Sequence, residues 1–459
     1  MIEGSTRLPR LLLAGVLVTL IALPGCQPVR ERRVPERLST PTWVELPFDR
    51  AQRMARLSEL KLLTVGAASA VITPPRRKGS YIAGFGPNRT SSGVLDPVEA
   101  RALYLHDGER GAVLVVVDAA GVSNDWVWHL RSRLSRDADM PLAVIATHDH
   151  HGPDLMGIWG PWFLWTVPIR SGVDPLYLAW LDERIVDMVD RAIRDARPAR
   201  VVIAKGEAPA RGLCYNERGD PEHWDRTVGV VKIEDLDGAT ISTLINFGCH
   251  PETLWDENTL FSADYPGVLR DRVEDALGGV AIFLPGSLGA MVTADIPRST
   301  PFEERVDFMR HLGAEVAGIA IEAVKKGGDA TGGGRLLYDR QVLSLPLNLW
   351  APRMAVRLGI LSRPVKEGRF LTEVNLLELG DTQFVLVPGE VPPEVGEELK
   401  ALMDAKHRFV VSTANDELGY VLNLKQCIDP EYEYEMGARF SADLYPEVMR
   451  AARKLLSGR

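Results

Sequence analysis

Residues 102–118 read ALYLHDGERGAVLVVVD, and this stretch decides the fold class. Its second part, 112–118, is a continuous apolar run of strand length, which is typical of a strand buried on both faces. The turn Asp107-Gly108 joins it to the apolar segment 102–106, so the two segments predict a β-hairpin. The folded part of the chain is therefore expected to contain a sheet with buried strands.

Further strands and helices alternate on both sides of this hairpin. Ser123 and Asp174-Pro175 each precede apolar residues at helical spacing, which predicts two helices. Hairpins mixed with strand–helix units predict an α/β fold, with a mixed β-sheet covered by helices in a single large domain. The other segments that support this prediction are a strand at 142–147, a hairpin at 228–233 and 239–247, a hairpin at 373–379 and 383–387, and a long helix after Pro301.

Composition is that of an ordinary globular protein. The chain has 459 residues, of which 46% are hydrophobic and 25% charged, and its formal net charge is -9. A chain of this length can bury a large core. Because the basic residues are scattered, no nucleic-acid partner is expected.

The N-terminus has the pattern of an export signal. Arg7 and Arg10 precede an apolar run, 11–23, that is too short to span a bilayer comfortably and fits a secretory signal. Leu23-Pro24-Gly25-Cys26 resembles a bacterial lipoprotein cleavage box, which predicts lipidation of Cys26 and attachment to the bacterial cell envelope. The alternative is an ordinary signal peptide in which Cys26 is incidental. We therefore divide the chain into a signal peptide (1–26), a tether (27–60) and a folded domain (61–459).

Three cysteines remain after Cys26, namely Cys214, Cys249 and Cys427. Three cysteines cannot all pair, and the chain has no Cys-x-x-Cys motif. We therefore expect free, mostly buried thiols rather than a disulfide framework or a cysteine-built metal site.

The most informative motif for function is THDHHGP at 147–153, which directly follows the predicted strand at 142–147. Strand ends are places where a rigid scaffold presents functional side chains. Because His148 and His150 are two residues apart, both point to the same side of an extended segment. One imidazole is therefore suited to binding a metal and the other to handling protons.

Two further strands end in possible metal ligands. His250 follows the strand at 239–247, and Glu390 follows the strand that ends at Val387. A catalytic zinc ion needs three or more protein ligands, usually from separated segments. Two imidazoles and one carboxylate at three strand ends therefore predict a metal site.

These segments, taken in order over residues 65–436, resemble the catalytic domain of the neutral/alkaline non-lysosomal ceramidase family. That family carries a Thr-His-Thr-His-Ser-Gly-Pro motif, which 147–153 matches with two substitutions. The resemblance implies that zinc binds His148, His250, Glu390 in a Pro-Gly-Glu string and Tyr420 in a Gly-Tyr-Val string. It also implies that His150 serves catalysis and that Arg218, in Asn216-Glu217-Arg218, lies at the substrate.

One departure concerns the nucleophile. The family has a serine in Gly-Asp-Val-Ser-Pro-Asn, whereas this chain reads GAMVTAD at 289–295. With one inserted residue, Thr293 occupies the serine position and Asp295 the asparagine position. Thr293 is then expected to act either as the nucleophile or as a hydrogen-bond partner of the attacking water.

The resemblance implies a zinc-dependent hydrolase of amide bonds, acting on N-acyl lipids such as ceramide and releasing a fatty acid and an amine. The expected partners are a lipid-like amide substrate and, through the anchor, a membrane; the oligomeric state is not predicted. Two alternatives stay open. One is another zinc hydrolase, of the amidohydrolase or metallo-β-lactamase type. The other is a surface-anchored binding protein whose catalytic activity has lapsed.

Overall fold

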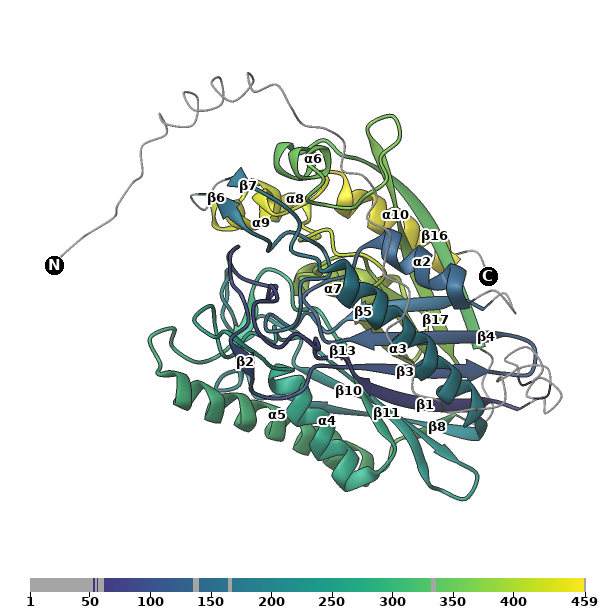
Figure 1. Cartoon of the computed structure of the whole chain (residues 1–459). Coiled ribbons are helices and arrows are strands. Elements are labelled where there is room, and N and C mark those ends of the chain that lie inside the picture. Colours follow the sequence, from purple (N-terminus) through teal and green to yellow (C-terminus); the bar gives the residue numbers. More distant parts are fainter. Residues whose placement is uncertain are drawn as a thin grey trace, which may run out of the picture. The chain divides into compact units, whose positions relative to one another are not determined.

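In a computed structural model of the chain, the expected hairpin is formed by β3 (Glu99–His106) and β4 (Gly111–Val117). All seven residues of β4 except its first are buried, as the apolar run predicts. Both strands belong to a large sheet at the centre of the fold (Figure 1).

The structure describes residues 53, 56, 62–134, 140–163, 167–331 and 336–457. The predicted signal peptide with Cys26 and most of the predicted tether lie outside this part, so export and lipid anchoring stay predictions. Within the described part, no helix combines the length and the apolar character needed to cross a membrane.

The large sheet is mixed and has nine strands. Its order is β13-β11-β10-β8-β1-β3-β4-β5, and β15 pairs with β8. The strand pairs β4–β5 and β11–β13 are parallel, and the other pairs are antiparallel. The strands not yet placed are β1 (Thr64–Val71), β5 (Leu142–Ala146), β8 (Arg197–Glu207), β10 (Thr227–Asp235), β11 (Thr240–Phe247), β13 (Val280–Pro285) and β15 (Asp329–Thr331).

A second sheet of four strands packs on the first. Its order is β16-β17-β18-β19, and it is built from the C-terminal part of the chain. One continuous apolar core contains buried residues of both sheets, including Leu103 and Ile203 from the first and Leu377 and Phe409 from the second. The strands are β16 (Leu336–Pro346), β17 (Arg369–Leu379), β18 (Thr382–Leu386) and β19 (His407–Val411).

Helices cover the outer faces of the two sheets (Figure 1). On the large sheet, α3 (Pro175–Arg194), α4 (Asp264–Leu277) and α5 (Phe302–Lys325) pack against its strands. On the small sheet, α7 (Pro393–Leu402) and α10 (Leu444–Ser457) do the same. The result is four layers in the order helices, sheet, sheet, helices. The predicted α/β class with a helix-covered mixed sheet is confirmed, whereas the pairing of two sheets was not predicted.

Short elements complete the loops above the strand ends. Three two-stranded ribbons join β2 (Gly93–Val94) to β12 (Leu260–Phe261), β6 (Trp162–Phe163) to β7 (Val167–Pro168), and β9 (Cys214–Asn216) to β14 (Val292–Ala294). The short helices are α2 (Asn124–Leu134), α6 (Trp350–Arg357), α8 (Leu424–Ile428), the 3-10 turn Pro430–Tyr432 and α9 (Glu433–Gly437).

The two halves of the large sheet are held together by buried charge as well as by backbone pairing. Strands β1 and β8 pair only at Thr64 and Val65, so the halves are joined at one corner. Further along, Arg270 of α4 donates two hydrogen bonds, of 2.6 and 2.7 Å, to the Asp118 carboxylate at the end of β4. Both side chains are almost fully buried. This ion pair lies close to the predicted histidine motif, because Asp149 donates its backbone N–H to Ala119.

Removing the arginine from this ion pair should destabilise the fold. In Arg270→Met the Asp118 carboxylate stays buried without its charged partner, which costs about 3–5 kcal/mol. Urea denaturation followed by circular dichroism measures the free energy of unfolding. Arg310→Met, which removes an exposed pair with Asp307 on α5, is the control and should leave stability nearly unchanged. A loss below about 1 kcal/mol in Arg270→Met would contradict this view of the ion pair.

Candidate metal centre and its cavity

His148 lies directly after β5 and is held in an unusual backbone conformation. Its φ angle is 66°, in the left-handed region that only a few residues other than glycine adopt. Such strain is found mainly where the surrounding structure fixes a functional side chain. Its Nδ1 donates to the carbonyl oxygen of Ala120 at 2.7 Å, because a carbonyl can only accept. The lone pair of Nε2 is therefore free to bind a metal ion.

His250 is oriented in the same way. It follows β11, is fully buried, and its Nδ1 donates to the carbonyl oxygen of Val292 at 3.0 Å. This contact fixes the tautomer in which Nε2 carries a lone pair. Both predicted imidazole ligands thus have one nitrogen tied to the backbone and the other available.

Glu390 brings a carboxylate to these two imidazoles from the small sheet. Its Oε2 lies 3.0 Å from Nε2 of His250 and 3.4 Å from Nε2 of His148. Burial by itself would raise the pKa of Glu390, but the two imidazoles hold it well below its usual range. Burial alone would likewise lower the pKa of His148, but the Glu390 carboxylate raises it above its ordinary value. The strand ends of both sheets therefore meet at one charged cluster.

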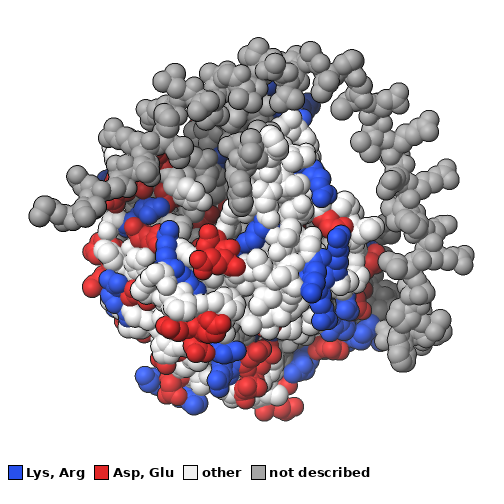
Figure 2. Space-filling view, turned by 60° about the vertical axis from the view of Figure 1, so that its left-hand side comes forward, with Lys and Arg blue, Asp and Glu red and all other residues white. Residues whose placement is uncertain are grey.

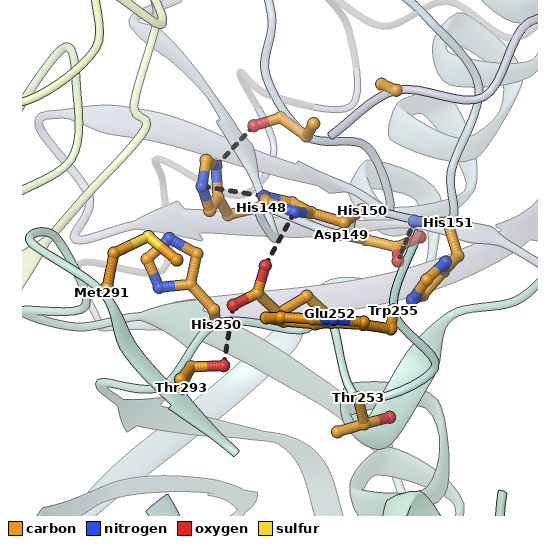
Figure 3. A network of polar contacts seen from close by, with 12 residues as sticks. His148, Asp149, His150, His151, His250, Glu252, Thr253, Trp255, Met291 and Thr293 are labelled. Atoms are coloured by element: carbon orange, nitrogen blue, oxygen red, sulfur yellow. Dashed lines mark hydrogen bonds and ion pairs between the residues drawn. The ribbon is translucent and has the colours of Figure 1, made fainter. Parts of the chain in front are cut away.

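His150 joins the same cluster. Its Nε2 is 3.2 Å from Nε2 of His148 (Figure 3), and the donor atoms of His148, His150 and His250 all lie within 4.8 Å of one another. Burial and the neighbouring imidazoles of His148 and His250 lower the pKa of His150 well below its usual value. Its ring is therefore neutral at physiological pH. The three buried imidazoles of His148, His150 and His250 and the carboxylate of Glu390, here called the donor cluster, form a site that can hold a metal ion.

The predicted fourth ligand, Tyr420, lies on the wall of the same cavity. Its backbone pairs with that of Glu390, and its hydroxyl donates to the sulfur of Met291 at 3.6 Å. Burial and the Glu390 carboxylate raise the pKa of its phenol well above the usual value, so the group is neutral. Its role as a ligand stays a prediction.

The other two predicted catalytic residues lie in different surroundings. Arg218 lines the cavity, and its Nε donates to the carboxylate of Glu435 at 2.7 Å. Thr293 is not among the residues that line the cavity. Its hydroxyl instead donates to Oε1 of Glu252 at 2.7 Å. Asp295, expected beside it, pairs with the exposed Arg211. The hydroxyl of Thr293 is thus engaged with Glu252 outside the cavity wall. Its function as a nucleophile stays a prediction.

The cavity above the cluster has a volume of about 940 Å³. The polar side chains that line it include His148, His150 and Glu390 of the donor set, together with Arg218, Glu252 and Glu417. Another part of its wall is apolar and comes from the loop before β6, from α6 and from the segment around Phe440. The apolar side chains are Met156, Ile158, Trp159, Trp162, Ala351, Pro352, Ala355, Leu361 and Phe440. Two of the three tryptophans that follow the histidine motif are thus part of this wall.

The face shown in Figure 2 carries side chains of both charges. Lysine and arginine side chains alternate there with aspartate and glutamate, and a broad uncharged area lies between them. Nucleic-acid binding surfaces are instead dominated by one sign of charge.

The expectation of free thiols is wrong for two of the three cysteines. Cys214 and Cys249 form a disulfide that closes a loop of 35 residues, whereas Cys427 is free. A count of three cysteines excludes complete pairing but not one bridge. Cys249 directly precedes His250, and Cys214 begins β9, which leads to Arg218. The disulfide therefore ties the strand before the arginine to the segment that carries a predicted metal ligand.

Some residues of the site were missed by sequence reasoning. Glu252 contacts both His150 and Thr293, and Met291 lines the cavity beside Tyr420. Gly84 packs so tightly on His150 that an added Cβ would lie 2.4 Å from the Cβ of the histidine. Only Glu252 had a signal in the sequence, since it stands two residues after His250 in the string His-Pro-Glu.

Comparison with known proteins identifies relatives of this fold. No protein-family model matches the chain. A neutral ceramidase of Mycobacterium tuberculosis is 24% identical over 291 residues, which is 55% of this chain and 44% of that protein. The match thus spans less than half the length of this curated relative.

Solved structures agree with this relationship. The crystal structure of neutral ceramidase from Pseudomonas aeruginosa superposes with a TM-score of 0.71 at 17% identity, over 86% of this chain and 75% of that one. A ceramidase complexed with C2 gives 0.69 at 16% identity, over 86% and 76%. Fold and site thus define a two-sheet α/β protein with a candidate metal centre. The proteins that it is similar to are neutral ceramidases, the family that the motifs resemble.

Loss of the disulfide should weaken both stability and the site. For a loop of 35 residues, chain entropy predicts a cost of about 3–4 kcal/mol in the double variant Cys214→Ser/Cys249→Ser. Metal affinity should also fall, because His250 follows the bridge directly. Thermal unfolding with and without metal measures both effects. The single variant Cys427→Ser is the control, and equal behaviour of the two variants would contradict the prediction.

Proposed function

We propose that the chain is a zinc-dependent amidase that hydrolyses N-acyl lipids of the ceramide type. The observation that carries the proposal is the convergence of His148, His150, His250 and Glu390 at a cavity that is partly lined by apolar side chains. Relatives named as neutral ceramidases support the same reaction.

The donor set fits zinc. Zinc prefers four imidazole, thiolate or carboxylate ligands in a tetrahedron at about 2.0–2.2 Å, which places neighbouring donor atoms about 3.3 Å apart. Oε2 of Glu390 lies 3.0 Å from Nε2 of His250 and 3.4 Å from Nε2 of His148, which is close to that separation. Backbone carbonyls hold the far nitrogens of His148 and His250, as is usual for metal-binding histidines. A bound zinc ion would polarise the substrate carbonyl and lower the pKa of a water molecule.

Residues of the chain would supply the remaining steps of hydrolysis. Water adds to the amide carbonyl carbon, the C–N bond breaks, and the amine leaves after taking up a proton. His150 is placed to carry this proton, since its Nε2 lies beside the proposed ligand His148 and its ring is neutral. Arg218 and the phenol of Tyr420 line the cavity and would orient the substrate by donating hydrogen bonds.

The apolar wall supports a lipid as the substrate. Apolar side chains from three segments line the same cavity as His148, His150 and Glu390, and the cavity volume is within the range of pockets that enclose an organic ligand. A long acyl chain would bury apolar surface there, at about 0.8 kcal/mol for each methylene group. A small polar amide would leave this wall exposed to water.

Removal of a ligand should abolish metal binding. Purified protein is expected to carry about one zinc ion. His148→Ala or Glu390→Gln should lower zinc affinity more than about 100-fold, because loss of a ligand itself costs more affinity than loss of a hydrogen-bond partner of a ligand. Hydrolysis of a fluorescent N-acyl amide should fall with it. His311→Ala, at an exposed histidine of α5, is the control for zinc content and activity. Full activity in metal-free protein would overturn the proposal.

The apolar wall should set the preference for acyl length. Trp159→Ala removes part of that wall, so KM for a long-chain N-acyl substrate should rise about tenfold, while KM for the N-acetyl analogue stays nearly constant. Trp180→Ala is the matched control, because Trp180 is a half-buried tryptophan of α3 that does not line the cavity. Equal effects on both substrates would argue against acyl binding at this wall.

The competing functions make different predictions. A protein that binds zinc and an N-acyl lipid but releases no fatty acid would be a binding protein with lapsed catalysis. An amidohydrolase barrel is not supported, because the described strands form two large open sheets and three two-stranded ribbons rather than a closed barrel. A screen of ceramides beside short N-acyl amides, on zinc-loaded protein, distinguishes the enzyme from the binding protein.

A further inference from the structure

We infer that Glu252 is a positioning residue that orients His150 and fixes its tautomer, and that Thr293 holds Glu252 in place. The inference rests on the proposed function, because it assigns a supporting residue to the proposed proton carrier. It also gives Thr293 a use other than that of a nucleophile. The three side chains form a chain of contacts from Thr293 through Glu252 to His150 (Figure 3).

The contacts of Glu252 are short and buried. One carboxylate oxygen accepts the hydroxyl hydrogen of Thr293 at 2.7 Å, and the other lies 3.1 Å from Nδ1 of His150. The side chain of Glu252 is 1% exposed. Nδ1 and the carboxylate are in close contact but do not form a hydrogen bond in this structure; catalytic contacts of this kind often tighten only when the substrate binds. A buried carboxylate is stable only with such partners.

The tautomer of His150 follows from this contact. A carboxylate can only accept, so the proton of the neutral imidazole is favoured on Nδ1 and the lone pair on Nε2. Nε2 faces His148 in the donor cluster. Without Glu252 the proton would be free to occupy Nε2, where it would point at the other imidazoles and block proton uptake.

The three imidazoles differ in this respect. His148 and His250 donate from Nδ1 to backbone carbonyls, which are neutral. Only His150, among the three, faces a charged carboxylate from its Nδ1. The difference matches the proposed roles, in which His148 and His250 would bind the metal and His150 would exchange a proton.

Two aromatic side chains and one arginine also restrict the ring of His150. Phe85 packs edge-on against it with a centroid distance of 5.0 Å, and Trp255 packs on Phe85 at 5.4 Å. Arg89 donates to the backbone oxygen of His150. These contacts restrict the position of the ring but include no other acceptor for Nδ1, so within the described residues the orientation of that nitrogen depends on Glu252.

The hydroxyl of Thr293 completes the arrangement. Its backbone is fixed by pairing between β14 and β9, opposite Tyr215, and its side chain is 2% exposed. Since its hydroxyl hydrogen is donated to Glu252 and the residue lies outside the cavity wall, direct attack on a substrate would require both features to change. A serine provides the same hydroxyl, whereas valine keeps the shape without it.

The test compares four variants of the full-length, zinc-loaded protein. Glu252→Gln removes the charge and Thr293→Val removes the hydroxyl. Thr293→Ser restores the hydroxyl, and Thr372→Val is the matched control. The Thr372 hydroxyl is buried and finds no hydrogen-bond partner within the described part of the chain. Measurements are kcat and KM on an N-acyl amide, zinc content, and ¹⁵N NMR of labelled histidines to assign the tautomer of His150.

For a positioning residue, kcat should fall about 10- to 100-fold in Glu252→Gln, with KM and zinc content nearly constant. The NMR spectrum should show loss of the pure Nδ1–H tautomer. Thr293→Val should lower kcat about tenfold, Thr293→Ser should recover most of that loss, and Thr372→Val should behave as wild type. A merely structural role would instead lower zinc content or thermal stability without changing the tautomer.

Two results would overturn the inference. The first is a wild-type tautomer of His150 in Glu252→Gln. The second is complete loss of turnover in Thr293→Val with an unchanged tautomer, which indicates a covalent nucleophile. If the wild-type protein hydrolyses no N-acyl amide, the proposed function fails. The NMR measurement still decides, independently of activity, whether Glu252 fixes the tautomer of His150.

Discussion

The arrangement of this site depends on one buried carboxylate. Glu390 lies at the end of a strand of the small sheet and contacts two imidazoles that follow strands of the large sheet. An ionised carboxylate with little access to water is stable only with such partners or with a metal ion. The packing of the two sheets must therefore bring these strand ends together, and the left-handed backbone of His148 is one local cost of doing so.

Around Glu390, the sheets and the loops contribute different parts of the site. The sheets supply rigid strand ends, and the loops and short elements beside them supply the wall of a cavity that is partly polar and partly apolar. The buried pair of Asp118 and Arg270 and the disulfide between Cys214 and Cys249 hold neighbouring segments in register. Precise placement of donors is what a metal site requires, since a shift of a fraction of an ångström changes its geometry. A shared fold with the neutral ceramidases fits this dependence on the scaffold.

Much of the fold was predictable because its signals are local. The hairpin at 102–118 was expected from an apolar run and an Asp-Gly turn, and β3 and β4 form it. The hairpins of β10 with β11 and of β17 with β18 were expected on the same grounds. The assembly of strands into two sheets was not predicted, because pairing between distant strands leaves no periodic trace in the sequence. The disulfide was missed for a related reason, since cysteine spacing does not report spatial proximity.

The sequence by itself determined which side chains were available: histidines and a glutamate directly after buried strands, in the order of a known family. Only the tertiary structure decided how they are used. It placed His150 in the donor cluster, set the Thr293 hydroxyl on Glu252 and put Tyr420 beside Met291. The physical reason is that residue types and strand ends are encoded locally, whereas the direction of each hydrogen bond depends on groups far apart in the chain. Glu252 and Thr293, separated by 41 positions, meet only in the folded protein.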